Sequence, residues 1–154
     1  MLMACEIAPI PNARIILVPI LRAGLALLPT FQEIFEAAPI GLLGIRRDEK
    51  TALPYLYYEK LPFLSPADQI FILDPMLATG GSANLALDRL AAQGADLDRA
   101  TLITIIAARE GIHSVKKRHP QVGIYSVAVD EELDSRKYIV PGLGDFGDRY
   151  FGTD

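Results

Sequence analysis

The stretch QIFILDPMLATGGSANLALDRLAAQG, residues 69–94, joins an apolar run, a glycine-rich turn and an amphipathic segment without interruption. Within residues 69–74, a continuous apolar run over 70–73 precedes a final acid, which is typical of strands buried on both faces of a parallel sheet. Residues 82–93 place small and apolar side chains on one helical face, and Gly94 is the expected stop. The stretch therefore predicts a strand, a turn and a helix in succession.

The same alternation runs along the rest of the chain. Further buried strands are expected over residues 14–20, 40–45, 100–108 and 123–129. Helices are expected over 24–38, with Pro29 in the first turn or at a break, and over 110–119, closed by Pro120. Strands that alternate with helices predict an α/β fold with right-handed crossovers, built as one domain over 1–154.

Composition restricts the classes of function. The 154 residues are 51% hydrophobic and carry a net charge of −4, which argues against a nucleic-acid binder with a broad basic surface. The single Cys5 cannot form an intrachain disulfide, which suits a reducing compartment. No apolar run is long enough to span a membrane, and the first residues lack the pattern of a signal peptide. A cytoplasmic location is therefore expected.

The turn between the strand and the helix has two interpretations. Gly80 and Gly81 allow a close approach of the backbone to a ligand, and the following helix presents unpaired N–H groups to an anion. Thr79 and Ser82 add hydroxyls, while Asp74 suits sugar hydroxyls or the waters on a Mg²⁺ ion. The alternative is a plain connection in which Ser82 caps the helix.

Two arginines follow apolar runs directly. Arg22 comes after the first expected strand and Arg47 after the second, so both should lie at the edge where parallel strands end. A single arginine there is most simply a surface ion pair. Two of them beside a glycine-rich turn indicate a polyanion such as pyrophosphate, which arginine binds through paired N–H groups.

Three other features have simpler alternatives. Residues 46–62 are charged and then aromatic, which fits a mobile loop over the site or a solvated hairpin. Residues 140–148 are rich in glycine, so their backbone can lie against a flat ligand, although an ordinary loop has the same composition. His113 and His119 are expected on a solvated helix surface.

Three segments together resemble the uracil phosphoribosyltransferase family. They are VPILRAG, DPMLATGGS and YIVPGLGDFGDRYFGT, which begin at residues 18, 74 and 138. The family's fold implies a phosphoribosyltransferase-type parallel sheet flanked by helices, with a flexible hairpin loop and a C-terminal hood that binds the base. The implied reaction joins uracil to 5-phosphoribosyl 1-diphosphate (PRPP), giving UMP and diphosphate.

The resemblance also implies roles for individual residues. Arg22 and Arg47 would contact the diphosphate side of PRPP, and Asp74 and Arg47 would be catalytic. The positions implied to bind substrates are Arg22, Arg47, Asp74, Pro75, Met76, Leu77, Ala78, Thr79, Gly80, Gly81, Ser82, Ile139, Gly144, Asp145 and Phe146. Mg²⁺ is the implied cofactor, with Asp145 near PRPP and its metal, and no side chain is assigned as a dedicated metal ligand.

The implied partners are the small molecules uracil and PRPP, with GTP as a candidate effector and a homodimer or higher homo-oligomer as the expected assembly. No nucleic acid or membrane is expected as a partner. Members of the family carry a longer segment before the first strand, where this chain has only residues 1–13, so we expect a shortened N-terminus. Three alternatives remain: an RNA-binding regulator, a non-catalytic relative that binds PRPP, and an enzyme for another base such as hypoxanthine or orotate.

Overall fold

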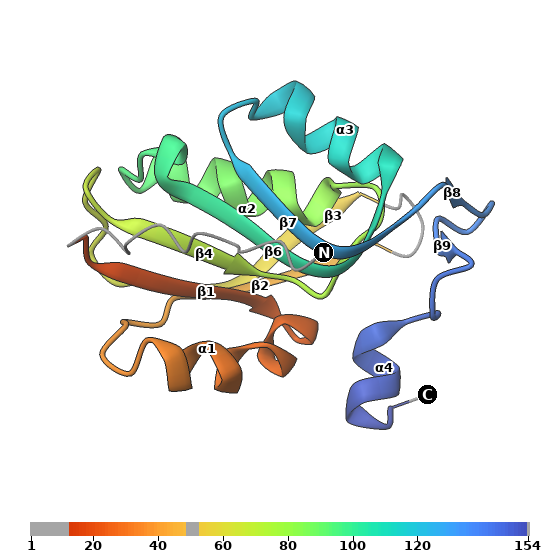
Figure 1. The fold of residues 1–154 in the computed structure, drawn as a ribbon, viewed down its shortest axis with the longest axis horizontal. Helices are drawn as coiled ribbons and strands as arrows, with labels where there is room; N and C mark the ends of the chain where they lie inside the picture. Colours follow the sequence, from red (N-terminus) through yellow and green to blue (C-terminus); the bar gives the residue numbers. More distant parts are fainter. Residues whose placement is uncertain (1–12, 49–52, 154) are drawn as a thin grey trace, which may run out of the picture.

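The computed structural model describes residues 13–48 and 53–153, and its centre is a seven-stranded sheet (Figure 1). The strands are β1 Ile15–Leu21, β2 Leu42–Arg47, β3 Pro54–Lys60, β4 Gln69–Leu73, β5 Met76–Leu77, β6 Ala100–Ala108 and β7 Gly123–Asp130. Their order is β3-β2-β1-β4-β6-β5, and β7 pairs with β6. All pairs are parallel except β2 with β3. The predicted α/β fold is confirmed.

Helices cover both faces of this sheet (Figure 1). The helices α2 (Gly81–Ala92) and α3 (Arg109–Arg118) lie on one face, and α1 (Leu28–Ile34) lies on the other. The short 3-10 helices are η1 (Ala23–Ala26) and η2 (Leu97–Arg99). Beyond β7 follow the strand pair β8 (Glu132–Leu133) with β9 (Ile139–Val140), and then α4 (Phe146–Phe151). In the described residues, no helix is long and apolar enough to cross a membrane.

The core lies between the sheet and α2, because both contribute continuous apolar faces. Ile16, Val18, Ile70 and Ile72 are fully buried in β1 and β4, and Leu87 of α2 packs into the same cluster. Burying one such side chain contributes roughly 1.5–3 kcal/mol. The core therefore fixes the two central strands, and with them the loops at their carboxyl ends.

Two helix predictions need correction. The helix expected over 24–38 is divided into η1 and α1, with Pro29 inside the first turn of α1, and it ends at Ile34. His119 was expected at a solvated surface but is only 8% exposed. The chain turns directly after His119 into β7, and this turn holds the imidazole Nε2 3.2 Å from the Asp88 carboxylate.

The segment after β2 is more regular than expected. Within residues 46–62, where a mobile loop was favoured, residues 54–60 form β3 and pair antiparallel with β2. The alternative of a hairpin holds for these two strands. Residues 49–52, at the centre of the expected loop, lie outside the described residues.

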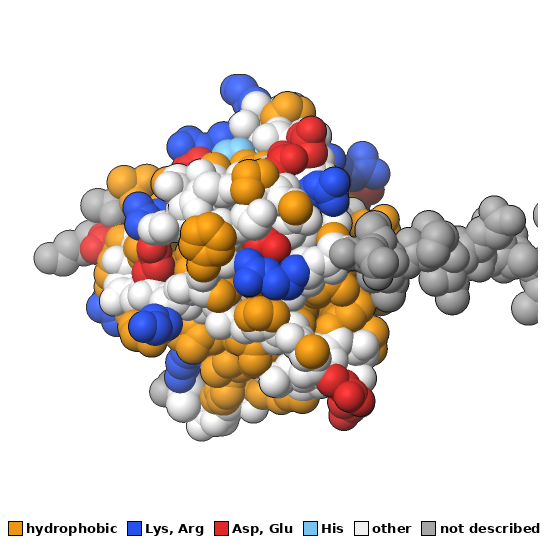
Figure 2. Space-filling model, turned by 90° about the vertical axis from the view of Figure 1, so that its left-hand side faces the viewer, with side chains coloured by type: hydrophobic (Ala, Val, Ile, Leu, Met, Phe, Trp, Pro, Cys, Tyr) orange, Lys and Arg blue, Asp and Glu red, His pale blue; other side chains and the backbone are white. Residues whose placement is uncertain are grey.

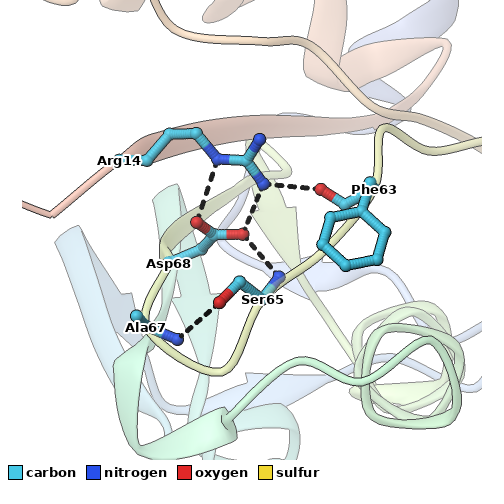
Figure 3. A network of polar contacts seen from close by, with 5 residues as sticks. All are labelled: Arg14, Phe63, Ser65, Ala67 and Asp68. Carbon is cyan, nitrogen blue, oxygen red and sulfur yellow. Dashed lines mark hydrogen bonds and ion pairs between the residues drawn. The ribbon is translucent and has the colours of Figure 1, made fainter.

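A polar network fastens the start of β1 to the loop before β4 (Figure 3). The Arg14 guanidinium donates from Nε and Nη2 to the two oxygens of Asp68, at 3.0 and 2.7 Å, and also to the Phe63 carbonyl at 2.5 Å. The Ser65 main-chain N–H donates to the same carboxylate at 2.7 Å. The hydrogen bond from Arg14 holds the pKa of Asp68 below its ordinary value of 3.8, against the opposing effect of burial.

Asp68→Asn is therefore expected to destabilise the fold in a pH-dependent way. Lost charge-assisted hydrogen bonds should lower the free energy of unfolding by about 1–3 kcal/mol at neutral pH. Because the folded pKa is lowered, this contribution is complete well above pH 4 and is lost as the pH falls through the folded pKa. Denaturant unfolding at several pH values measures the difference, which should shrink in acid.

Glu131→Gln is the matched control. Glu131 forms an ion pair with Arg109 in which both side chains are exposed, the Glu131 side chain by 70% and the Arg109 side chain by 69%. Exposed pairs contribute little to stability. The role given to the network would be contradicted if Asp68→Asn lost no more unfolding free energy than the control. It would also be contradicted if the loss stayed the same in acid.

Candidate active site

The turn after β4 is clamped to the neighbouring strand β6. The Pro75 carbonyl accepts from the main-chain N–H groups of Ile105 at 2.9 Å and Ile106 at 3.1 Å. The buried Thr104 hydroxyl donates to the same oxygen at 2.9 Å. A proline fits here because the position supplies an acceptor and needs no N–H. These bonds fix the path of the chain from β4 into β5.

Asp74 stands at the end of β4, immediately before this clamp. Its main-chain N–H donates to the Ile103 carbonyl at 3.1 Å, so the residue is held in register with β6. Burial of the carboxyl raises the pKa of Asp74 from 3.8 to about 7, and the Met76 main-chain N–H partly offsets this by donating to the carboxylate. A carboxyl in this state accepts hydrogen bonds from a ligand at little extra desolvation cost, because burial has already removed much of its water.

The turn leads into α2 through Gly80. Gly80 has a φ of +81° and a side chain on it would lie 2.9 Å from the Gly111 carbonyl of α3. A side chain on Gly111 would in turn lie 2.5 Å from the Ala78 carbonyl. The two glycines let the backbone of the turn pack directly against the backbone of α3. This contact holds the turn in place.

The start of α2 corrects one prediction. Ser82 was the alternative cap of the helix, but the helix begins at Gly81 and the capping position is Gly80. The first main-chain bond of the helix runs from the Asn84 N–H to the Gly80 carbonyl, at 2.9 Å. The N–H groups of the three residues before Asn84 therefore precede the helical ladder, and this group of donors is what an anion requires.

The two glycines of the turn should respond differently to substitution. We expect Gly80→Ala to lower the free energy of unfolding by roughly 1–2 kcal/mol, because the added side chain needs a left-handed backbone and meets Gly111. Gly81→Ala should cost less, because its φ is ordinary and the added side chain requires only a small shift of the Pro54 ring, 3.3 Å away. Thermal unfolding of both variants measures this. Equal losses would contradict the assigned geometry.

The arm formed by β2 and β3 brings Arg47 toward the same turn. Arg47 is exposed at the end of β2 and pairs in the ladder with Pro54. Pro54 lies near Gly81, because a Cβ atom added to Gly81 would be 3.3 Å from the Pro54 ring. Farther along, Glu59 of β3 accepts from Arg89 of α2 at 2.7 Å, so the arm rests on α2.

Arg22 lies at the end of β1, after a cis peptide bond from Leu21. Its Nη2 donates to Asp148 Oδ1 at 2.9 Å and to the Thr153 hydroxyl at 3.3 Å. The guanidinium carbon also lies 5.6 Å from the centre of the Phe151 ring. The C-terminal segment is thereby attached to an arginine predicted to bind diphosphate.

Gly24 brings the Arg22 loop against the end of β4. It is buried, and a side chain on it would collide with the Leu73 carbonyl and lie 3.1 Å from the Pro19 Cα atom. Because Leu73 directly precedes Asp74, this contact sets the spacing between the arginine loop and the acid. The ends of β1, β2 and β4 therefore meet at one edge of the sheet, as predicted.

The C-terminal segment presents mainly backbone. Ile139 is 2% exposed and lies in the β8–β9 pair, so its side chain is buried. Gly144 has a φ of +80°, and the Asp145 carboxylate caps α4 by accepting the Asp148 N–H at 2.9 Å. A shallow hollow of about 310 Å³ on α4 is lined by Leu143, Phe146, Arg149 and Tyr150. Phe146 is the one predicted site residue in that lining.

Comparison with known proteins decides the family. A sequence profile described as uracil phosphoribosyltransferase matches residues 4–153. The chain belongs to the uracil phosphoribosyltransferase family. The chain is 49% identical over 140 residues to the uracil phosphoribosyltransferase of Latilactobacillus sakei, covering 91% of this chain and 66% of that protein. It thus spans just under two thirds of that relative's length.

Solved structures agree with the family's fold. The AQ2163 protein of Aquifex aeolicus superposes with a TM-score of 0.86 at 40% identity, over 91% of this chain and 66% of that one. The adenine phosphoribosyltransferase of Trypanosoma brucei, at 15% identity, superposes with a TM-score of 0.64 over 89% of this chain and 63% of its own. At that identity the second match shows the fold alone.

Sequence reasoning missed four residues that shape the site, namely Gly24, Thr104, Gly111 and Asp148. Gly24 and Asp148 lie inside the quoted family segments, so the resemblance drew attention to their neighbourhood but assigned them no role. Thr104 is a polar residue within an apolar strand, which was the available signal. No local pattern distinguishes Gly111 from other helical glycines.

Proposed function

We propose that the chain transfers the phosphoribosyl group of PRPP to uracil, with UMP and diphosphate as products. The observation that carries this proposal is the clamped turn from Asp74 to Gly80, which holds an acid beside the first N–H groups of α2. Those of Ser82 and Ala83 precede the helical ladder, and that of Gly81 donates to the Thr79 hydroxyl at 3.4 Å. Membership of the uracil phosphoribosyltransferase family supports it and indicates the substrates. The clamp makes the turn a rigid cradle, which suits a reaction driven by positioning.

The turn and α2 would hold the sugar phosphate. The N–H groups of Gly81, Ser82 and Ala83 and the Thr79 hydroxyl would surround the 5-phosphate, and Asp74 would accept from the ribose hydroxyls. Pro75 is buried, has no N–H and has its carbonyl held by β6, so within the proposed set it would shape the turn, whereas the buried Leu77 would act through its backbone. Met76 and Ala78 are partly exposed and complete the same stretch.

Charge neutralisation would provide most of the catalysis. As the bond from the anomeric carbon to the diphosphate breaks, that carbon becomes cation-like, and N1 of uracil bonds to it and releases its proton to the departing diphosphate or to water. Arg22 and Arg47 would stabilise the negative charge on the leaving diphosphate. Asp74 would fix the ribose and its carboxylate would stabilise the developing positive charge.

Mg²⁺ is the proposed cofactor, and the donors present fit it. Among the described residues no three acidic, histidine or cysteine side chains form a metal cage. Mg²⁺ is usually held by one or two carboxylates together with substrate phosphates. Asp74 and Asp145 would be those carboxylates, and Asp145 uses only Oδ1 to cap α4. When bound, the ion would neutralise part of the diphosphate charge.

The base would be selected by main-chain groups of Ile139 and of Gly144 to Phe146. Uracil and cytosine present opposite donor and acceptor character at N3 and C4, so one backbone pattern cannot satisfy both. A buried group left unpaired costs about 1–3 kcal/mol, which corresponds to a preference of roughly ten- to a hundredfold.

The experiment is an assay of UMP formation from labelled uracil, PRPP and Mg²⁺, with cytosine, hypoxanthine and orotate in parallel. We expect turnover with uracil and little with the other bases. Turnover with a purine alone would assign another base. PRPP binding without any product would favour the alternative of a non-catalytic relative.

The setting of the reaction is also proposed. We infer action in the cytoplasm as a homodimer or higher homo-oligomer, with GTP as a candidate effector by family resemblance. The edge of the sheet opposite the site mixes acidic, basic and apolar side chains without a broad basic area (Figure 2). The net charge of −4 favours small-molecule substrates over nucleic acid.

A further inference from the structure

Arg22 uses only part of its hydrogen-bonding capacity on the C-terminal segment. Both of its contacts there, to Asp148 Oδ1 and to the Thr153 hydroxyl, come from Nη2. Within the described residues, the N–H groups of Nε and Nη1 have no acceptor. A guanidinium donates in several directions within one plane, so these remaining groups can bind an anion while Nη2 keeps its partners.

The helix α4 depends on this attachment. It contains six residues, none of them buried, and helices of this length are unstable without tertiary contacts. Asp148 accepts from Arg22 and also from the Thr153 hydroxyl, at 3.0 Å. The Phe151 ring lies against the same guanidinium. Asp148 is therefore the centre of the contact that places α4 against the Arg22 loop and η1.

The base-reading residues directly precede α4. Gly144 is two residues before the helix, and Asp145 caps it through the N–H of Asp148. The position of Asp148 consequently determines where residues 144–146 lie relative to Arg22. No role for Asp148 follows from the reaction itself, because its carboxylate is engaged by Arg22 and Thr153.

We propose that Asp148 is a positioning residue that couples the two substrates through Arg22. Diphosphate bound to Nε and Nη1 would fix the guanidinium, the fixed guanidinium would hold Asp148 and α4, and α4 would hold the segment that reads uracil. Uracil and diphosphate then strengthen each other's binding. The inference rests on the proposed function, because it takes Arg22 as a diphosphate ligand.

The charges predict opposite effects on the two ligands when Asp148 is neutralised. Asp148→Asn keeps the shape of the side chain but weakens its hold on Arg22, so the base segment loosens and uracil binds less well. The same change removes a negative charge near the diphosphate and leaves Arg22 with more of its own charge for the anion. A general loss of structure would weaken both ligands.

The test uses inorganic pyrophosphate with Mg²⁺ and uracil, which cannot react with each other, and measures their affinities separately and together by calorimetry. In the wild-type protein we expect each ligand to raise the affinity for the other roughly fivefold or more. In Asp148→Asn, uracil affinity should fall by a similar factor, pyrophosphate affinity should stay the same or increase, and the coupling factor should approach one. Arg22→Gln should weaken both ligands.

Asp88→Asn is the matched control, because Asp88 pairs with Arg118 at 2.7 Å on a partly exposed helix surface remote from Arg22. It should leave both affinities and their coupling unchanged. Thr153→Val, which removes the second acceptor of Nη2, should lose part of the coupling. Circular dichroism should show an intact sheet in every variant, because α4 buries none of its residues.

The outcomes distinguish failure of the coupling from failure of the proposed phosphoribosyl transfer. Unchanged uracil affinity in Asp148→Asn, or equal weakening of both ligands, would overturn the coupling while leaving the phosphoribosyl site in place. A wild-type protein that binds neither pyrophosphate nor PRPP would overturn the proposed function and this inference with it.

Discussion

Asp74→Asn is expected to make the protein more stable and a poorer binder of PRPP at the same time. The variant keeps the size of the side chain but cannot ionise. Loss of a charge-assisted hydrogen bond to the ribose should weaken PRPP binding about tenfold or more, since such bonds contribute roughly 1.5–3 kcal/mol. Calorimetric titration with PRPP and Mg²⁺ measures this loss.

The gain in stability follows from the raised pKa. The folded protein holds the Asp74 proton up to about pH 7, whereas the unfolded chain releases it near 3.8. Between these values the wild type loses stability as the pH rises, and above them the cost is complete. Asparagine avoids this cost, so the variant should be more stable by about 2–4 kcal/mol at neutral pH, where the lower value allows for the residue's partial exposure.

Unfolding experiments across this pH range test both the sign and the size of the stability difference between Asp74→Asn and the wild type. The difference between variant and wild type should be small near pH 4 and should grow toward pH 7. Asp98→Asn, at an exposed position in η2, should show neither effect. A variant that binds PRPP normally would remove Asp74 from the site, and one that is less stable at neutral pH would contradict the burial of its carboxyl.

Gly24→Ala is expected to have the second large effect. The added methyl group would collide with the Leu73 carbonyl and approach the Pro19 backbone, so the strand ends must separate. Overpacking of this kind costs roughly 1–3 kcal/mol, and main-chain neighbours place it toward the upper end. Because Leu73 precedes Asp74, the shift should also weaken PRPP binding. Chemical denaturation and PRPP titration measure the two losses.

Gly94→Ala is the control for Gly24→Ala, because it introduces backbone strain without steric crowding. Gly94 has a φ of +93° with no atom within 4 Å of an added side chain, and it lies beyond the far end of α2. It should lose about 1 kcal/mol for the left-handed backbone and leave PRPP binding unchanged. If Gly24→Ala is as stable as the wild type, the close contact with Leu73 does not constrain the site.

The strands were predictable because their signal is local. Five apolar runs in the sequence became β1, β2, β4, β6 and β7, and burial of the first four accounts for their continuous apolar residues. The expected burial of β7 is wrong, because among the described strands it pairs only with β6 and leaves Tyr125, Val127 and Val129 exposed. The strand β3 escaped prediction because its charged and aromatic residues are half-exposed on an outer strand, and pairing with β2 decides its structure. The end of α1 was also missed, because residues 35–38 continue the helical composition without forming the helix.

The site was predictable only where its functional residues lie close together in the sequence. Asp74 and the paired glycines stand out in one turn, but sequence alone could not show that Gly80 has the positive φ and Gly81 an ordinary one. The contact between Arg22 and Asp148 joins residues 126 positions apart, and no local pattern specifies it. The raised pKa of Asp74 depends likewise on burial, which packing determines.

The most direct test of the account is to follow the amide resonances of α2 during a titration with PRPP and Mg²⁺. The N–H groups of Gly81, Ser82 and Ala83 precede the first helical bond, so they are the donors assigned to the 5-phosphate. We expect their signals to shift strongly and their hydrogen exchange to slow, while the far end of α2 at Ala92 changes little. Saturation with PRPP that leaves these three amides unchanged would contradict the assignment of this turn as the phosphoribosyl site.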